Sequence, residues 1–201
     1  MEVLDLYWNN FQNNILLSLG EITSLRSLNL SSNNFKGSFP VEELKALEHL
    51  ETLDVSSNDF SDPPKVQDFK SWKNLIILNL EGNIFNNNIL PFVSTLTSLK
   101  TLDLANNNLG ASISITELSS LENLEQLDMS YNGLKNLEGI VDGLSRLQKL
   151  KVLNLEGNNI MKSNLKSSDL AKLKNLEILD LSSIALKGSL TMLAGITSKV
   201  P

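Results

Sequence analysis

The stretch Leu25-Arg26-Ser27-Leu28-Asn29-Leu30-Ser31-Ser32-Asn33-Asn34-Phe35 decides the architecture of this chain. Leucines alternate with polar residues through its centre, which is the periodicity of a β-strand. Alternation predicts that Leu28 and Leu30 face a core, whereas Asn29 and Ser31 face solvent. The stretch therefore reads as one short strand followed by a polar turn.

The same pattern, Leu-x-x-Leu-x-Leu-x-x-Asn-x-Leu, occurs eight times, at intervals of 24 to 26 residues. A fixed period of this length is typical of a solenoid, in which each repeat contacts only its neighbours. We therefore expect a single domain over residues 1–201, with its short strands aligned in one parallel sheet. The repeats begin at Met1, Leu25, Leu50, Leu75, Leu99, Leu124, Leu150 and Leu176.

An asparagine follows the strand in seven of the eight repeats, and the eighth repeat has Ile184 instead. A carboxamide has two donors and two acceptor lone pairs, so it can bond backbone groups of its own and the next repeat. A structural ladder is therefore favoured over a catalytic role. Its members are Asn9, Asn33, Asn58, Asn83, Asn107, Asn132 and Asn158.

The segments between strands have rhythms of their own. Leucines spaced three apart, as in Leu44-x-x-Leu47-x-x-Leu50, predict 3₁₀ turns or short helices on the opposite side from the sheet. Trp72 belongs to this rhythm and is expected in the core. A column of aromatic residues beyond the asparagines predicts ring packing along the first half of the chain. Its members are Phe11, Phe35, Phe60 and Phe85.

Composition excludes several classes of function. The formal net charge of −6 argues against a nucleic-acid binder, which needs a basic face. The chain has no cysteine and one histidine, His49, so it offers neither a catalytic triad nor a zinc site. No glycine-rich loop opens a helix to hold a phosphate. We expect no enzyme activity, no metal and no cofactor.

The two ends lack the polar caps that repeat arrays need. Met1 already occupies the first motif position, and the rhythm breaks at Lys199, so we expect an uncapped piece of a longer protein. The first residues show no basic segment followed by an apolar run, and no stretch approaches membrane-helix length.

Residues just beyond the asparagine identify a family. Phe35-Lys36-Gly37-Ser38-Phe39-Pro40 is similar to the Leu-x-Gly-x-Ile-Pro extension of plant-type leucine-rich repeats, and Leu186-Lys187-Gly188-Ser189-Leu190 matches all but the proline. Over nearly its whole length, the chain resembles the ectodomain of a plant leucine-rich-repeat receptor-like protein, or that of a receptor-like kinase.

The resemblance implies an α/β fold, a right-handed horseshoe solenoid with a parallel sheet on its concave face and short helices or 3₁₀ turns on its convex face. It also implies a glycosylated extracellular region of a plasma-membrane protein in defence or development. Such proteins bind a peptide, protein or microbial ligand on the concave face and signal through a co-receptor kinase.

Two other functions stay open at this point. A secreted inhibitor of a microbial wall-degrading enzyme, as the plant polygalacturonase inhibitors are, uses the same repeat. A truncated decoy or scaffold without signalling would also fit the missing caps.

The outward strand positions carry most of the acidic charge. Eleven acids and three bases, Arg26, Lys100 and Lys151, give this strip a charge of −8 and leave +2 for the rest of the chain. A negative face favours a cationic or hydroxyl-rich partner and salt-sensitive association. The acids are Glu2, Asp5, Glu51, Asp54, Glu81, Asp103, Glu125, Asp128, Glu156, Glu177 and Asp180.

Tyr131 is the first contact candidate, because an aromatic residue stands there at an exposed strand end where small polar residues are usual. Arg26 and Lys100 come next, because they break the acidic trend. Asn29-Leu30-Ser31 is the one glycosylation acceptor sequence in the chain. The full set of ligand-binding candidates is Tyr131, Arg26, Lys100, Lys151, Glu125, Asp128, Asp103 and Asp54.

Overall fold

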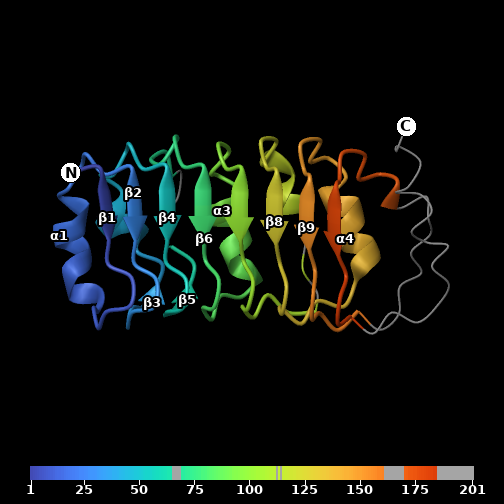
Figure 1. The fold of residues 1–201 in the computed structure, drawn as a ribbon, viewed down its shortest axis with the longest axis horizontal. Coiled ribbons are helices and arrows are strands. Elements are labelled where there is room, and N and C mark those ends of the chain that lie inside the picture. The colour runs from blue at the N-terminus through green and yellow to red at the C-terminus, as the bar shows by residue number, and fades with distance from the viewer. Residues whose placement is uncertain (65–68, 112, 114, 161–169, 185–201) are drawn as a thin grey trace.

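A computed structural model describes residues 1–64, 69–111, 113, 115–160 and 170–184. Its main feature is an eight-stranded parallel sheet with the order β1-β2-β4-β6-β7-β8-β9-β10, seen as one row in Figure 1. Each strand is only three residues long, because the inward leucines are followed at once by the polar turn. The strands are β1 (Val3–Asp5), β2 (Ser27–Asn29), β4 (Thr52–Asp54), β6 (Ile77–Asn79), β7 (Thr101–Asp103), β8 (Gln126–Asp128), β9 (Val152–Asn154) and β10 (Ile178–Asp180).

The register places equivalent residues of successive repeats side by side. Leu28 pairs with Leu4 on one side and Leu53 on the other, and the pattern continues to Leu179. The interior leucines of this column are fully buried, whereas Leu4 and Leu179 at the two edges are half-buried. Burial is therefore supplied by the neighbouring repeat, as the solenoid pattern predicts.

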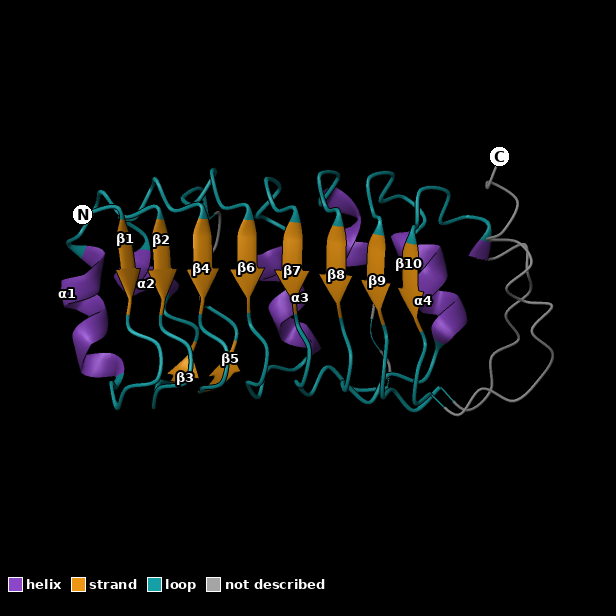
Figure 2. Ribbon diagram, viewed as in Figure 1, coloured by secondary structure: helices purple, strands orange, loops and turns teal. Residues whose placement is uncertain are grey.

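Short helices cover the opposite side of the sheet, as Figure 2 shows. Their inward residues, such as Leu16, Val41 and Leu90, join the same hydrophobic core. No helix among the described residues is long and apolar enough to cross a membrane. The helices are η1 (Asn13–Ile15), α1 (Leu16–Gly20), α2 (Val41–Leu44), η2 (Asn87–Ile89), α3 (Leu90–Val93), η3 (Ile115–Ser120) and α4 (Leu137–Leu144).

A second sheet of two strands, β3 (Lys36–Ser38) and β5 (Asp59–Asp62), lies below the main one in Figure 1. Just after β3, Phe39 enters the core and contacts the rings of Phe60 and Trp72, each with centroids 6.1 Å apart. Trp72 is buried, as expected, and its indole N–H donates to the Leu44 carbonyl at 3.2 Å. The plant-type extension thus supplies a buried ring as well as a turn.

The predicted phenylalanine column is present in part. Phe35, Phe60 and Phe85 stack with nearly parallel rings, their centroids 6.0 and 6.4 Å apart. Phe11 is half-buried, and among the described rings the stack begins at Phe35. The edge repeat has no neighbour on its outer side to complete the packing. The Leu186–Leu190 match and Lys199 lie outside the described residues.

The ladder asparagines form hydrogen bonds with backbone groups of the preceding repeat. The Asn83 amide donates to the carbonyls of Val55, Leu80 and Glu81 at 3.0 to 3.2 Å, and its oxygen accepts the Phe60 N–H at 3.0 Å. Two of these groups belong to the preceding repeat, so the expectation of bonds to the next repeat is wrong in direction. From the second to the seventh repeat, the turn after the strand thus directs the asparagine toward the preceding repeat.

Ser31 also departs from the expected pattern. It was expected to face solvent, yet it is buried, and its hydroxyl donates to the side-chain oxygen of Asn29 at 2.6 Å. Strand alternation ends at Leu30, because the backbone turns there, so a residue predicted to point outward is instead folded into the turn.

Candidate ligand-binding surface

Three rows of equivalent residues run across the main sheet, one residue per repeat. The entry row, just before each strand, is Glu2, Arg26, Glu51, Ile76, Lys100, Glu125, Lys151 and Glu177. The central row, at the end of each strand, is Asp5, Asn29, Asp54, Asn79, Asp103, Asp128, Asn154 and Asp180. The exit row, two residues later, is Tyr7, Ser31, Ser56, Glu81, Ala105, Ser130, Glu156 and Ser182.

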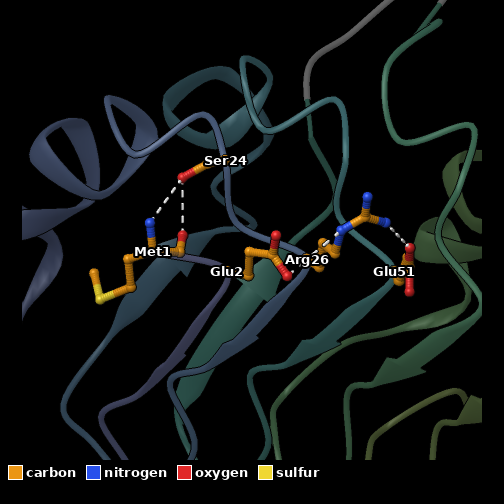
Figure 3. Close-up of polar contacts among 5 residues, drawn as sticks. All are labelled: Met1, Glu2, Ser24, Arg26 and Glu51. Carbon is orange, nitrogen blue, oxygen red and sulfur yellow. Dashed lines mark hydrogen bonds and ion pairs between the residues drawn. The ribbon is translucent and has the colours of Figure 1, made fainter.

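The entry row alternates in sign, and its charges pair between repeats. Figure 3 shows Arg26 between Glu2 and Glu51. Its Nε lies 3.9 Å from a Glu2 carboxylate oxygen, and its Nη1 forms a closer ion pair with Glu51. Arg26 is thus positioned as a bridge between three repeats.

A second bridge centres on Glu125. Its carboxylate oxygens lie 2.9 Å from Lys151 Nζ and 3.7 Å from Lys100 Nζ. The bond from Lys151, with its positive charge, holds the pKa of Glu125 below its usual range, and Glu125 raises the pKa of Lys151 in return. Exposed pairs of this kind are weak, so a ligand can exchange for either partner at little cost.

The central row performs a structural task. In every repeat its side-chain oxygen accepts the backbone N–H two residues on, for example Ser56 to Asp54 at 2.9 Å and Ser130 to Asp128 at 2.8 Å. Such local bonds satisfy the backbone where it leaves the strand. One oxygen of each carboxylate is therefore engaged within the repeat.

The unbalanced negative charge lies in the central and exit rows from β4 onward. We call these six carboxylates the acidic strip, and within the described residues none of them forms an ion pair with a cation. The described part of the chain also contains no cluster of three or more histidines and acids placed to hold a metal. The acidic strip is Asp54, Glu81, Asp103, Asp128, Glu156 and Asp180.

Tyr131 lies beside the acidic strip with 47% of its surface exposed. Its backbone has a φ of +52°, a region that bulky residues rarely adopt. The phenol donates to a Glu156 carboxylate oxygen at 2.7 Å, and this bond to an anion raises the pKa of the phenol. The ring also covers Gly157, where a methyl group would lie 2.3 Å from Cε1 of Tyr131. The ring is thus held in place while about half of the residue's surface stays exposed.

The structure brings most of the candidates together. Six of them lie on or beside three consecutive strands, β7, β8 and β9, whereas Arg26 and Asp54 lie on or beside β2 and β4. Sequence reasoning left Glu156 and Gly157 out of the candidate set, although Gly157 lies one repeat period after Tyr131 and Glu156 directly precedes it. The six are Lys100, Asp103, Glu125, Asp128, Tyr131 and Lys151.

The glycosylation candidate Asn29 lies on the same face, at the end of β2. Its oxygen accepts from the backbone N–H and the hydroxyl of Ser31 at 2.9 and 2.6 Å. In the sheet order, β2 lies four strands away from β8, which Tyr131 follows, so a glycan on Asn29 would be attached far from Tyr131.

Comparisons with known proteins agree with this architecture. Residues 1–194 match the family model described as a leucine-rich repeat region. Receptor-like protein 13 of Arabidopsis thaliana is 40% identical over 126 residues, covering 61% of this chain and 12% of that protein. Receptor-like protein 9a of the same plant is 46% identical over 65 residues, covering 32% of this chain and 7% of that protein. The chain thus spans about a tenth of the length of these relatives.

Among solved structures, the ectodomain of the Arabidopsis receptor kinase HAESA, in complex with an extended IDA peptide hormone, superimposes with a TM-score of 0.70. It is 30% identical to this chain and covers 90% of it, while the chain covers 30% of that ectodomain.

Proposed function

This chain belongs to the leucine-rich-repeat family, and from that premise we propose that it forms part of the ligand-recognition surface of a plant receptor-like protein. The ligand is a peptide or protein, including microbial ones, held on the exposed face of the main sheet. The HAESA ectodomain, which contains a peptide hormone in its solved complex, supports a ligand of this class.

One observation carries this proposal: the charged side chains of the entry row form ion pairs with one another, whereas the carboxylates of the acidic strip do not. In the entry row, the three cations pair with acids of neighbouring repeats. The acidic strip beside it has no such partners among the described residues, and Tyr131 bonds to one of its members, Glu156. A surface of this kind favours an extended ligand with a lysine or arginine, whose cation can also lie over the Tyr131 ring.

We place the protein at the plasma membrane, with this region outside the cell, and assign it a co-receptor kinase as signalling partner. The similarity to plant receptor-like proteins supports both assignments. The role is binding rather than catalysis, and the net charge of −6 disfavours a nucleic-acid ligand.

The test is an array of synthetic peptides of about 12 residues, a length that spans several strands of the sheet when the peptide is extended. One set of peptides is rich in lysine or arginine, and the other set is rich in glutamate. The purified chain is compared with the double variant Tyr131→Ser, Glu156→Gln. Two other repeats have a serine at the position of Tyr131, Ser32 and Ser57, and both adopt the same positive φ, so the variant should fold.

A matched control is the double variant Glu42→Gln, Lys45→Gln, which removes an exposed ion pair around α2 on the helical side. The proposal expects basic peptides to bind the unchanged chain and the control equally, and the Tyr131/Glu156 variant about tenfold more weakly. Binding that is lost equally in both variants, or no binding by any basic peptide, would refute it.

A further inference from the structure

Asp103 differs from three other central-row carboxylates, Asp54, Asp128 and Asp180, in the donors around it. Its Oδ1 accepts the Ala105 backbone N–H at 2.9 Å, as the structural role requires. The equivalent oxygens of Asp54 and Asp128 also accept a serine hydroxyl, at 2.7 Å in both cases. Ala105 has no hydroxyl, so this second bond is missing at Asp103.

The neighbouring amides do not replace that bond. In the sheet register, Asp103 lies between Asn79 of β6 and Asp128 of β8. The Asn79 amide donates to Asp54 at 3.2 Å, on the far side from Asp103. Within the described part of the chain, Asp103 therefore has no side-chain donor, and its neighbour on β8 is another carboxylate.

Its surroundings disfavour the charged form. Partial burial, together with the negative charges of Asp128, Glu81 and Asp54, raises the pKa of Asp103 to about 6, against a smaller lowering by the Ala105 N–H. The entry-row residue of the same repeat is Lys100, which pairs with Glu125. At the far end of the row, half-buried Asp180 accepts the hydroxyl and the N–H of Ser182, and these bonds lower its pKa.

We propose that Asp103 is a proton-dependent regulator of the acidic strip, ionised and favourable to a cationic ligand near neutral pH, and neutral and less favourable in mildly acidic surroundings. This inference rests on the proposed function, because it concerns the same surface. Below about pH 6 the strip loses one charge at its centre, beside Asp128 and Glu81. Losing one unit charge about 4 Å from a ligand cation weakens binding about fivefold in water.

The variant Ala105→Ser tests the cause directly. It supplies the hydroxyl that Ser56 and Ser130 supply in equivalent, equally buried positions, so the fold should tolerate it. Carboxyl ¹³C NMR titration should place the Asp103 transition near pH 6 in the unchanged chain and clearly lower in Ala105→Ser. The signal is assigned by its absence in Asp103→Asn. An Asp103 transition at the ordinary value for aspartate in the unchanged chain would overturn the inference, whatever ligand binds.

Binding of the probe acetyl-Arg-Arg-Arg-amide at about pH 7.5 and pH 5 tests the consequence. The unchanged chain should bind about fivefold more weakly at the lower pH. Ala105→Ser should bind well at both values, and Asp103→Asn should bind weakly at both. Equal pH dependence in all three proteins would overturn the regulatory role. No binding of the probe at either pH would instead refute the proposed cationic recognition, a result that the NMR titration keeps separate.

Discussion

Tyr131 lies with its ring directly over Gly157, the residue at the same position one repeat later, and its hydroxyl donates to Glu156 at 2.7 Å. The contact depends on the absence of a side chain at Gly157, whose φ of +65° also favours glycine. The same position has a positive φ in every repeat, for example at Ser32 and Asn106, so this geometry belongs to the turn, and a bulky residue there stores about 1–3 kcal/mol of strain. The pair thus holds an exposed aromatic ring in place on the proposed ligand surface.

The first prediction concerns this pair. Gly157→Ala should lower the unfolding free energy by about 2 kcal/mol, because it adds backbone strain and a clash with the Tyr131 ring. In a Tyr131→Gly background the ring is gone, and the same change should cost about 1 kcal/mol. Urea denaturation of the four proteins measures the coupling. Identical costs in both backgrounds would show that the ring does not rest on Gly157.

The second prediction concerns the asparagine ladder. Asn83→Ala should cost about 3 kcal/mol, because it leaves buried backbone groups of two repeats without partners. Asn9→Ala is the matched control, because Asn9 is exposed and, among the described residues, its side chain bonds only the carbonyls of Leu6 and Tyr7. That change should cost less than about 1 kcal/mol. Thermal and urea unfolding check both values, and equal costs would contradict a ladder role for Asn83.

The third prediction concerns pH and stability. The folded-state pKa of Asp103, about 6, lies above the ordinary 3.8, so the native state binds the proton more tightly than the unfolded state. This carboxyl therefore lowers stability as pH rises from about 4 to 6, and the penalty persists above 6. Asp103→Asn should stabilise the chain near neutral pH by about 1 kcal/mol, allowing for solvent screening, and have little effect below pH 4.

Denaturant unfolding across that pH range measures the Asp103 effect. Asp180→Asn is the control of opposite sign, because the folded-state pKa of Asp180 is lowered. The stability that Asp180 contributes is present above the ordinary pKa of aspartate and is lost as pH falls, so Asp180→Asn should not increase the stability at neutral pH. A stabilisation by Asp103→Asn that is independent of pH would rule out the proton as its cause.

The fourth prediction concerns the bridge at Glu125. Lys151→Gln should raise the pKa of Glu125 toward its usual range, because the bond from Lys151 is the largest cause of its lowering. Lys100→Gln should raise it less, since Lys100 lies 3.7 Å away rather than 2.9 Å. Carboxyl NMR titration of both variants gives the order. A larger effect of Lys100 would mean that the bridge is arranged differently in solution.

The fifth prediction concerns Asn29. Expressed through a plant secretory pathway, the chain should carry one N-glycan, and Asn29→Asp should carry none while keeping the fold, because aspartate serves the same position in β4 and β8. Intact mass before and after glycosidase treatment measures the difference. An unchanged mass after treatment of the original chain would remove Asn29 as a modification site.

Much of the fold could be predicted from the sequence, because the structure of each repeat depends on its own residues and those of its neighbours, and not on distant residues. The leucine period placed the strands, and the strand alternation placed Leu28 and Leu30 inward. The errors came where the backbone turns. Ser31 is buried rather than exposed, because alternation holds only while the strand lasts.

The candidate surface was predictable only in outline. A count of charges predicts an acidic face, but it does not show which of these charges are paired. In the structure, Arg26, Lys100 and Lys151 are engaged with acids of neighbouring repeats, which moves the unbalanced charge to the central and exit rows. Ion pairing depends on the distances between side chains across the sheet, and a count of charges in the sequence gives no information on these distances.

The sequence by itself determined the solenoid, its single parallel sheet and its inward leucine columns, because a fixed period repeats the same local physics in every turn. The tertiary structure alone decided how individual side chains differ within those identical turns. Asp103 faces a carboxylate and lacks a hydroxyl donor, whereas Asp128 has both a hydroxyl and an amide. The Tyr131 ring packs on a glycine only because the register of the repeats places Gly157 beneath it. These differences depend on distances between repeats, which exist only once the chain is stacked.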